Sequence, residues 1–232
     1  MDYCGIEVGR EALHHLCVLR EVRTEDPPVK LEARFYDPGS ADALVARIGT
    51  LGDVVVAVGA PMTGSLHGRE RRTCDHMLRR VGVAPRPFTD EGGRLFEDLS
   101  PLGIFSPDSD EREGNVPDMA YEETPVFETN AEGVFAALEN RRLPARRHPL
   151  GVQRRIQELL DNHVLDAGGE LWHRRIDEIE AAAVAVCAHR FAVGHARWIG
   201  APDEGVVVLP GSGPVHPFTT EGVMPPVTRT PL

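Results

Sequence analysis

Cysteines are few in this sequence, and their spacing suggests no shared site. Cys4, Cys17, Cys74 and Cys187 are scattered over the 232 residues without a C-x-x-C pair. This spacing argues against a cysteine-based zinc site and against a disulfide framework. We therefore expect four reduced, buried thiols in a cytoplasmic protein.

Long apolar runs are also absent. The chain is 41% hydrophobic, but no stretch approaches the roughly 18 uninterrupted apolar residues that a membrane span needs. The acidic start, MDYCGIEVG, lacks the pattern of a secretory signal. We expect no membrane partner, one globular domain over residues 1–210, and a proline-rich tail over residues 211–232 that is extended or disordered.

An excess of positive charge is missing too, because the formal net charge is −11. The total therefore does not imply nonspecific binding to nucleic acid. Two basic stretches, Arg69–Arg80 and Arg141–Arg155, could still contact phosphates, although solvated surface explains them at least as well. No H-E-x-x-H, G-x-S-x-G or P-loop motif is present.

What the sequence does contain is a clear order of elements. Tyr3–Val8, Leu13–Val22 and Leu31–Tyr36 predict three strands of an antiparallel meander. A helix capped by Ser40 then leads to the apolar run Asp53–Val58, which is typical of a buried parallel strand.

The second half of the chain predicts helices and two more strands. The expected segments are a basic helix over Arg69–Val81, an irregular insertion over Pro85–Pro117, a strand over Met119–Thr124, helices over Ala131–Leu138 (capped by Asn130), Val152–His163 and Leu171–Gly194, and a strand over Gly205–Leu209.

This order of elements predicts an α/β protein with a ribonuclease H-like mixed sheet, an antiparallel meander plus parallel strands, flanked by helices. In such a sheet the first and fourth strands are neighbours, and the closing helix crosses them. Glu7 on the first strand, Gly59 after the fourth, and Asp177 and Glu180 on the closing helix should then lie close together.

Asp177 and Glu180 are three residues apart, so they project from one face of their helix above an apolar stripe. Glu178 and His189 point away from that face and are expected to be solvent-exposed. Acids in the first turns of a helix also interact favourably with its dipole, and that explanation stays open for the pair.

Several short motifs, in this order and spacing, resemble the domain of unknown function 429 family, predicted nucleases with a ribonuclease H-like fold. The motifs are G-I-E-V-G from Gly5, V-V-V-A-V-G-A-P from Val54, Arg72 with Asp75, Glu122 with Pro125, P-L-G-V-Q from Pro149, D-x-x-E-A from Asp177, and G-x-P-x-E-G-x-V-x-x-P from Gly200.

The resemblance implies a metal-dependent phosphodiester hydrolase. Glu7, Glu122, Asp177 and Glu180 would hold Mg²⁺ or Mn²⁺ and form the catalytic set, and nucleic acid would be the partner. Arg69 and Arg72 are candidates to bind the substrate phosphate. A homo-oligomeric assembly stays open.

One position departs from the family pattern, because Gly59 stands where the family has an aspartate. Two-metal cleavage needs carboxylates that hold cations about 4 Å apart, and Mg²⁺ tolerates little change in ligand geometry. Two hypotheses follow: a nuclease with an altered carboxylate site, or a catalytically degenerate ribonuclease H-like scaffold that binds a protein or nucleic acid.

Overall fold

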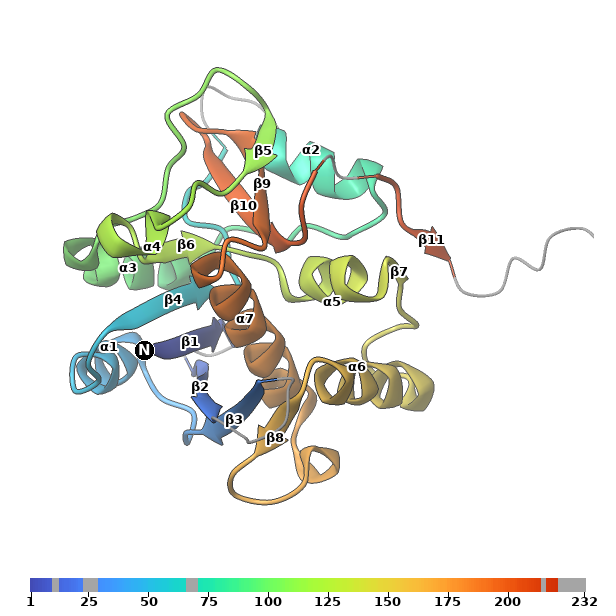
Figure 1. Ribbon diagram of the computed structural model, residues 1–232. Helices are drawn as coiled ribbons and strands as arrows, with labels where there is room; N and C mark the ends of the chain where they lie inside the picture. The colour runs from blue at the N-terminus through green and yellow to red at the C-terminus, as the bar shows by residue number, and fades with distance from the viewer. Residues whose placement is uncertain (10–12, 23–28, 66–70, 214–215, 221–232) are drawn as a thin grey trace, which may run out of the picture.

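The computed structural model describes residues 1–9, 13–22, 29–65, 71–213 and 216–220. Its centre is a six-stranded mixed sheet with the strand order β6-β4-β1-β2-β3-β8 (Figure 1). β1, β2 and β3 form the antiparallel meander, and β4 lies parallel to β1. β6 and β8 add parallel strands at the two edges. The strand order confirms the expected ribonuclease H-like fold class.

The strands of this sheet are β1 (Asp2–Glu7), β2 (His15–Val22), β3 (Lys30–Phe35), β4 (Val54–Val58), β6 (Val126–Glu128) and β8 (Val164–Asp166). The helices are α1 (Ala41–Ile48), α2 (Thr73–Arg80), α3 (Asp90–Leu99), α4 (Ala120–Glu123), α5 (Ala131–Glu139), α6 (Pro149–Asp161) and α7 (Ile176–Ala192), with two 3-10 turns, η1 (Ser100–Leu102) and η2 (Leu171–His173).

Helices cover both faces of the sheet. On one face, α7 packs against Tyr3 of β1 and Leu19 of β2, and α5 and α6 complete this part of the core. On the other face, α1 and α3 pack against Cys4 and Ile6. Because side chains alternate along a strand, Glu7 belongs to the same face as Tyr3, which is the face covered by α7.

Gly5 allows α7 to cross β1 at close range. A Cβ at this position would lie 2.2 Å from both Ala181 O and Ala185 N. Any larger residue would therefore push the helix away from the sheet. Between Ile179 and Ala188, every α7 residue is buried and all but Glu180 are apolar, so this part of the helix lies inside the molecule.

A second sheet lies beyond one end of the first, beside α2 (Figure 1). It contains β9 (Ala196–Ala201), with β10 (Gly205–Pro210) on one side and β5 (Glu113–Asn115) on the other. Its apolar side chains pack against Cys74 and Leu78 of α2. The four cysteines are free and buried, as expected.

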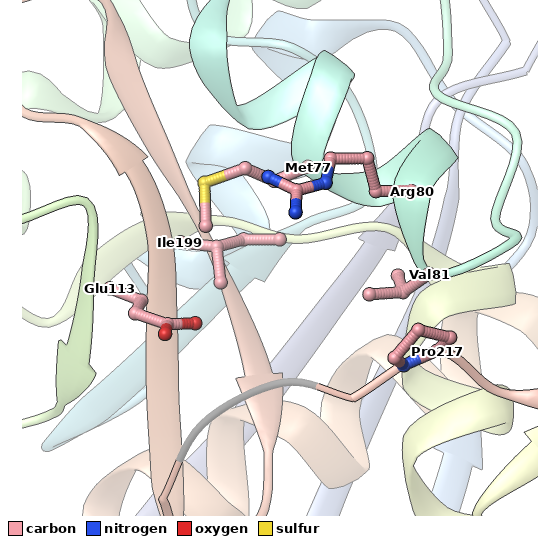
Figure 2. Close-up of a pocket in the computed structure, with 6 residues that line it drawn as sticks. All are labelled: Met77, Arg80, Val81, Glu113, Ile199 and Pro217. Atoms are coloured by element: carbon pink, nitrogen blue, oxygen red, sulfur yellow. The ribbon is translucent and has the colours of Figure 1, made fainter.

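Part of the proline-rich tail packs on this unit. Phe218 is buried, and its N–H donates to Val81 O at 3.1 Å. β11 (Thr219–Thr220) pairs in parallel with β7 (Arg141–Arg142). Figure 2 shows Pro217 at a small cavity of about 170 Å³ between α2 and β9, with the opposite charges of Arg80 and Glu113 at its border.

Two expected segments differ from the structure. Residues 119–124 form the short helix α4 instead of a strand, and the strand β6 follows Pro125. Pro125 lacks an N–H but still takes part in the pairing of this edge strand, because its carbonyl accepts a hydrogen bond from Val56 N at 2.8 Å. The expected insertion over 85–117 contains the regular helix α3, whose N-cap Thr89 accepts from Gly92 N at 3.1 Å.

The closing helix is shorter than expected, and a strand was missed after it. Residues 171–173 form η2, α7 begins at Ile176, and β9 occupies the segment read as a turn. His189 is buried, not solvent-exposed, because α7 lies inside the molecule, and its ring packs edge-on against Tyr3. Glu178 accepts from Arg175 N at 2.8 Å and so caps the start of α7.

Within the described residues, no helix is both long and apolar enough to cross a membrane.

Candidate functional site

Glu7 ends β1 on the face covered by α7, and its side chain is only 1% exposed. Gly59 lies directly beside it, as expected, since Gly59 N donates to Ile6 O at 2.7 Å. A Cβ at Gly59 would lie 2.5 Å from Glu7 Oε2 and 3.2 Å from Val184 Cγ2. The absence of a side chain at position 59 therefore makes the space that the Glu7 carboxyl occupies.

Asp177 and Glu180 occupy the first turns of α7, and both form an ion pair with Arg146. Arg146 Nη2 lies 2.7 Å from Asp177 Oδ1 and 2.7 Å from Glu180 Oε2. Glu180 is buried, whereas the Asp177 side chain is 41% exposed. The common partner shows that the two acids project from one face of the helix, as their spacing predicts.

A second arginine joins this pair to Glu7. Arg86 Nη2 forms an ion pair with Glu7 Oε1 and lies 3.1 Å from Glu180 Oε2. The contact with Glu7 lacks hydrogen-bond geometry, so both Glu7 oxygens are buried without a hydrogen-bond partner among the described residues. Two guanidinium groups therefore lie between three carboxyl groups.

Burial controls the electrostatics of this cluster. It raises the pKa of the Glu7 carboxyl well above its usual range, while Arg86 lowers that pKa and Glu180 raises it. Burial alone would lower the pKa of Arg146, but the charges of Glu180 and Asp177 raise it overall. Arg146 therefore stays charged beside Glu180 and Asp177.

The divalent metal that the resemblance implies does not fit this arrangement. Guanidinium groups occupy the space between the carboxylates, and Gly59 supplies no ligand. Within the described ranges, no group of three or more His, Cys, Asp or Glu side chains is placed to hold a metal ion. A cation could enter only if Arg86 and Arg146 moved away.

Glu122, expected beside Glu7, lies elsewhere. It is exposed on α4, before the start of β6, whereas Glu7 lies where the parallel strands end. A Cβ at Gly194 would lie 3.1 Å from Asp118 Oδ1. The segment that leads into α4 therefore lies at the C-terminal end of α7, whereas Asp177 lies at its N-terminal end. A helix of this length separates its ends by about 25 Å.

Glu128 is the acid at the end of β6, opposite Val58 in the register. Its side chain is 2% exposed, and its two oxygens each accept from Arg72 at 2.7 Å. Glu128 Oε2 also accepts from Met62 N at 2.7 Å. The carboxylate is therefore fully engaged in a buried, bidentate pair.

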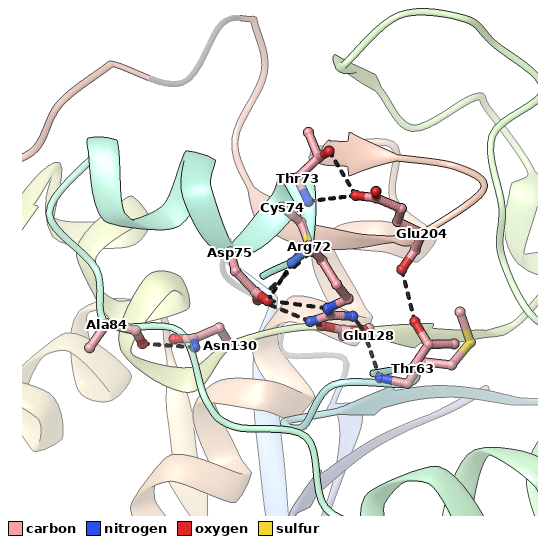
Figure 3. A network of polar contacts seen from close by, with 10 residues as sticks. Thr63, Arg72, Thr73, Cys74, Asp75, Ala84, Glu128, Asn130 and Glu204 are labelled. Carbon is pink, nitrogen blue, oxygen red and sulfur yellow. Dashed lines mark hydrogen bonds and ion pairs between the residues drawn. The ribbon is translucent and has the colours of Figure 1, made fainter. Parts of the chain in front are cut away.

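Arg72, expected to bind substrate, is part of this structural network (Figure 3). Its side chain is 2% exposed and also reaches Asp75 Oδ1 at 3.1 Å. Glu204, just before β10, accepts from Thr73 N at 2.7 Å. The network thus joins β6, the start of α2 and the second sheet. Arg69, the other expected phosphate ligand, lies outside the described residues.

Two cavities adjoin the carboxylate cluster, both of them lined by Arg86, the partner of Glu7 and Glu180. The first, of about 450 Å³, includes Arg71, Arg79 and Phe88. The second, of about 560 Å³, includes Arg147 and Arg175. Arg86 and Pro87 line both cavities. Asp75 and Asp177 also line the cavities, but they are paired with Arg72 and Arg146, and the remaining charged lining residues are arginines. On a chain of net charge −11, this is a local concentration of positive charge.

Sequence reasoning missed the two arginines that hold the cluster. Arg146 does fall within the basic stretch Arg141–Arg155, but nothing in its spacing indicates Asp177 and Glu180 as partners. Arg86 lies in the segment that was expected to be irregular. Glu128 carries a usable signal, since it ends a short apolar strand and precedes the N-cap Asn130.

A further pair of acids lies at the α5–α6 contact, apart from this cluster. Glu158 and Glu139 are joined by a side-chain hydrogen bond, and burial together with that bond raises the pKa of Glu158 to about 8. The pKa of Glu139 is lowered, chiefly by the same hydrogen bond. One of the two carboxyls therefore keeps its proton at neutral pH.

Fold and site together define an α/β protein of ribonuclease H-like topology with arginine-paired carboxylates. No family model matches the chain, and no curated protein matches it. Among solved structures it is similar to RuvC of Thermus thermophilus, with 16% identity and a TM-score of 0.39 over 83% of this chain and 95% of that one. This likeness is too weak to carry any argument about activity.

Proposed function

We propose that this protein binds the phosphodiester backbone of a nucleic acid, on a ribonuclease H-like scaffold whose carboxylate cluster is neutralised by its own arginines. The observation that carries the proposal is the convergence of arginines on the two adjoining cavities. Arg71, Arg79 and Arg147 have no ion-pair partner in the part of the chain that the structure describes. Phosphate groups would supply the missing negative charge.

The location supports the same proposal. Residues just after β1, near the end of α2 and at the start of α7 line the two cavities, which share Arg86 and Pro87. Charge of one sign gathered in a cleft concentrates counter-charged ligands there, even on a protein of opposite net charge. A polyanion could contact several of these arginines at once.

Salt dependence tests the proposal. Binding of labelled single strands and duplexes, followed by fluorescence anisotropy between about 50 and 200 mM salt, should weaken steeply as counterions are released. Arg147→Gln should reduce the slope by about one charge. Lys30→Gln is the matched control, because Lys30 is exposed at the opposite end of the sheet. No binding by the parent protein, or equal effects of both variants, would refute the proposal.

Metal-dependent phosphodiester hydrolysis is the second candidate, and the resemblance to the domain of unknown function 429 family belongs with it. It requires Arg86 and Arg146 to move away from the carboxyl groups, and the observation that favours it is the gathering of Glu7, Asp177 and Glu180, with both Glu7 oxygens lacking hydrogen bonds among the described residues. Millimolar Mn²⁺ should then raise the melting temperature of the parent and not of Asp177→Ala. Absence of a shift, together with no cleavage of DNA or RNA, would exclude this candidate.

A further inference from the structure

Phe88 is an exposed aromatic residue in the lining of the first cavity. Phe88 is 42% exposed, and it lines this cavity together with Arg71 and Arg79. Arg86 and Pro87, which precede it, line both cavities. The chain is poor in aromatics, at 6%, so an exposed ring among arginines is a notable position.

The ring is held in place by its neighbours. A Cβ at Gly93 would lie 3.0 Å from Phe88 Cζ, and a Cβ at Gly64 would lie 3.7 Å from Phe88 Cδ1. The ring therefore lies against two residues that have no side chains. Pro87 restricts the backbone before it, and Thr89 caps α3 after it. A ligand that packs on Phe88 would find a ring whose freedom is already limited.

An aromatic face beside arginines suits a nucleic acid with unstacked bases. Bases of a single strand can stack on a side-chain ring while cationic groups follow the phosphates, whereas a duplex keeps its bases stacked inside. Apolar cavities for small ligands instead surround the ligand with hydrophobic side chains. Here the partly exposed ring lines the same cavity as Arg71, Arg79 and Arg86, and the adjoining cavity adds Arg147 and Arg175.

We propose that the two cavities form the binding surface for a single-stranded nucleic acid, with one base stacked on Phe88 and the flanking phosphates contacted by Arg71, Arg79 and Arg147. This inference rests on the proposed function, because it names the class of nucleic acid that the same surface takes. Glu7 and Glu180 lie buried beneath this surface, paired with Arg86 and Arg146, and Asp177 lines the second cavity, paired with Arg146.

The test compares single-stranded and double-stranded probes of about 12 nucleotides or base pairs by fluorescence anisotropy. The parent should bind oligothymidylate more tightly than a duplex of equal length. Phe88→Ala should weaken single-strand binding about tenfold, and Phe88→Tyr should restore it, because a base stacks on either ring. The duplex affinity of Phe88→Ala should equal that of the parent.

Leu102→Ala is the matched control, since Leu102 is 41% exposed in η1, beyond the C-terminal end of α3, and lines neither cavity. Equal melting temperatures of the variants show that folding is intact. If Phe88→Ala binds the single strand as the parent does while Arg79→Gln and Arg147→Gln bind it more weakly, the stacking inference is overturned and the proposed function survives. If the parent binds neither probe, the proposed function itself fails.

Discussion

Arg146→Gln is the substitution that most directly tests the arginine-paired cluster. The guanidinium contacts two carboxylates at 2.7 Å, one from Asp177 and one from Glu180. Glutamine removes the charge and keeps part of the side-chain volume. The expected result is loss of stability without loss of the fold, because α7 remains held by its apolar contacts with the sheet.

The magnitude follows from the exposure of the two partners. Removing the cation from a buried carboxylate costs about 3–5 kcal/mol, whereas an exposed ion pair contributes about 0–1 kcal/mol. Glu180 is 4% exposed, Asp177 is 41% exposed and Arg146 itself is 34% exposed. Since Arg86 still reaches Glu180, we expect a loss of about 2 kcal/mol, mostly through Glu180.

The loss should also depend on pH. Arg86 and Arg146 both lower the pKa of Glu7, which burial raises overall. Without Arg146 this folded-state pKa rises further. A carboxyl with a raised folded-state pKa contributes stability that is present at low pH and lost as the pH rises through that pKa. The deficit of the variant relative to the parent should therefore be larger above the folded-state pKa of Glu7 in the parent than at acidic pH.

Urea denaturation in both pH ranges measures these effects. Arg147→Gln is the matched control, because Arg147 is the exposed neighbour without an ion pair among the described residues. A double-mutant cycle with Glu180→Gln should give a coupling free energy of about 1 kcal/mol or more. The reasoning is refuted if Arg146→Gln costs no more than Arg147→Gln, or if the coupling is zero.

Three further changes test other parts of the structure. Because the pKa of Glu158 is raised to about 8, the free energy of unfolding should fall as the pH rises from about 4.5 to 8, by up to about 1.4 kcal/mol per pH unit. Glu158→Gln should flatten this pH dependence in urea titrations. Gly5→Ala should lower the free energy of unfolding, measured in urea, by about 3 kcal/mol or more. Gly52→Ala should leave it nearly unchanged, because no atom lies within 4 Å of the added Cβ. Equal losses in the two variants would contradict the close approach of α7 to β1. Glu128→Gln should cost about 3–5 kcal/mol by leaving Arg72 buried with less compensating charge, and a change below about 1 kcal/mol would show the pair to be dispensable.

Local signals in the sequence determined much of the fold. Ser40 and Asn130 accept hydrogen bonds at the starts of α1 and α5, as their positions predict. The apolar run before Gly59 forms the parallel strand β4. The three-residue spacing of Asp177 and Glu180 puts both side chains on one face of α7, where both contact Arg146. These features depend on a few neighbouring residues, so a short window of sequence contains the information.

The errors arose where tertiary contacts outweigh local pattern. The segment 119–124, which Pro125 stops, is a strand candidate by sequence, but β4 pairs with the residues after Pro125. α3 contains adjacent glycines that weaken the helical signal, yet Leu95, Phe96 and Leu99 bury its apolar face against the sheet. Packing energy from the assembled core decides such segments.

The sequence by itself determined the order β1-β2-β3-α1-β4 with a long helix near the end of the chain, and the meeting of Glu7, Gly59, Asp177 and Glu180 at one end of the sheet, because strand direction and helix periodicity follow from the pattern of apolar residues. Only the tertiary structure decided what compensates these acids. Arg86 and Arg146 come from distant segments, and a side chain with several rotatable bonds can reach partners that no spacing rule specifies. Tertiary packing also placed Phe88 beside Arg71 and Arg79, since contacts between separate loops depend on the folded arrangement of the whole chain.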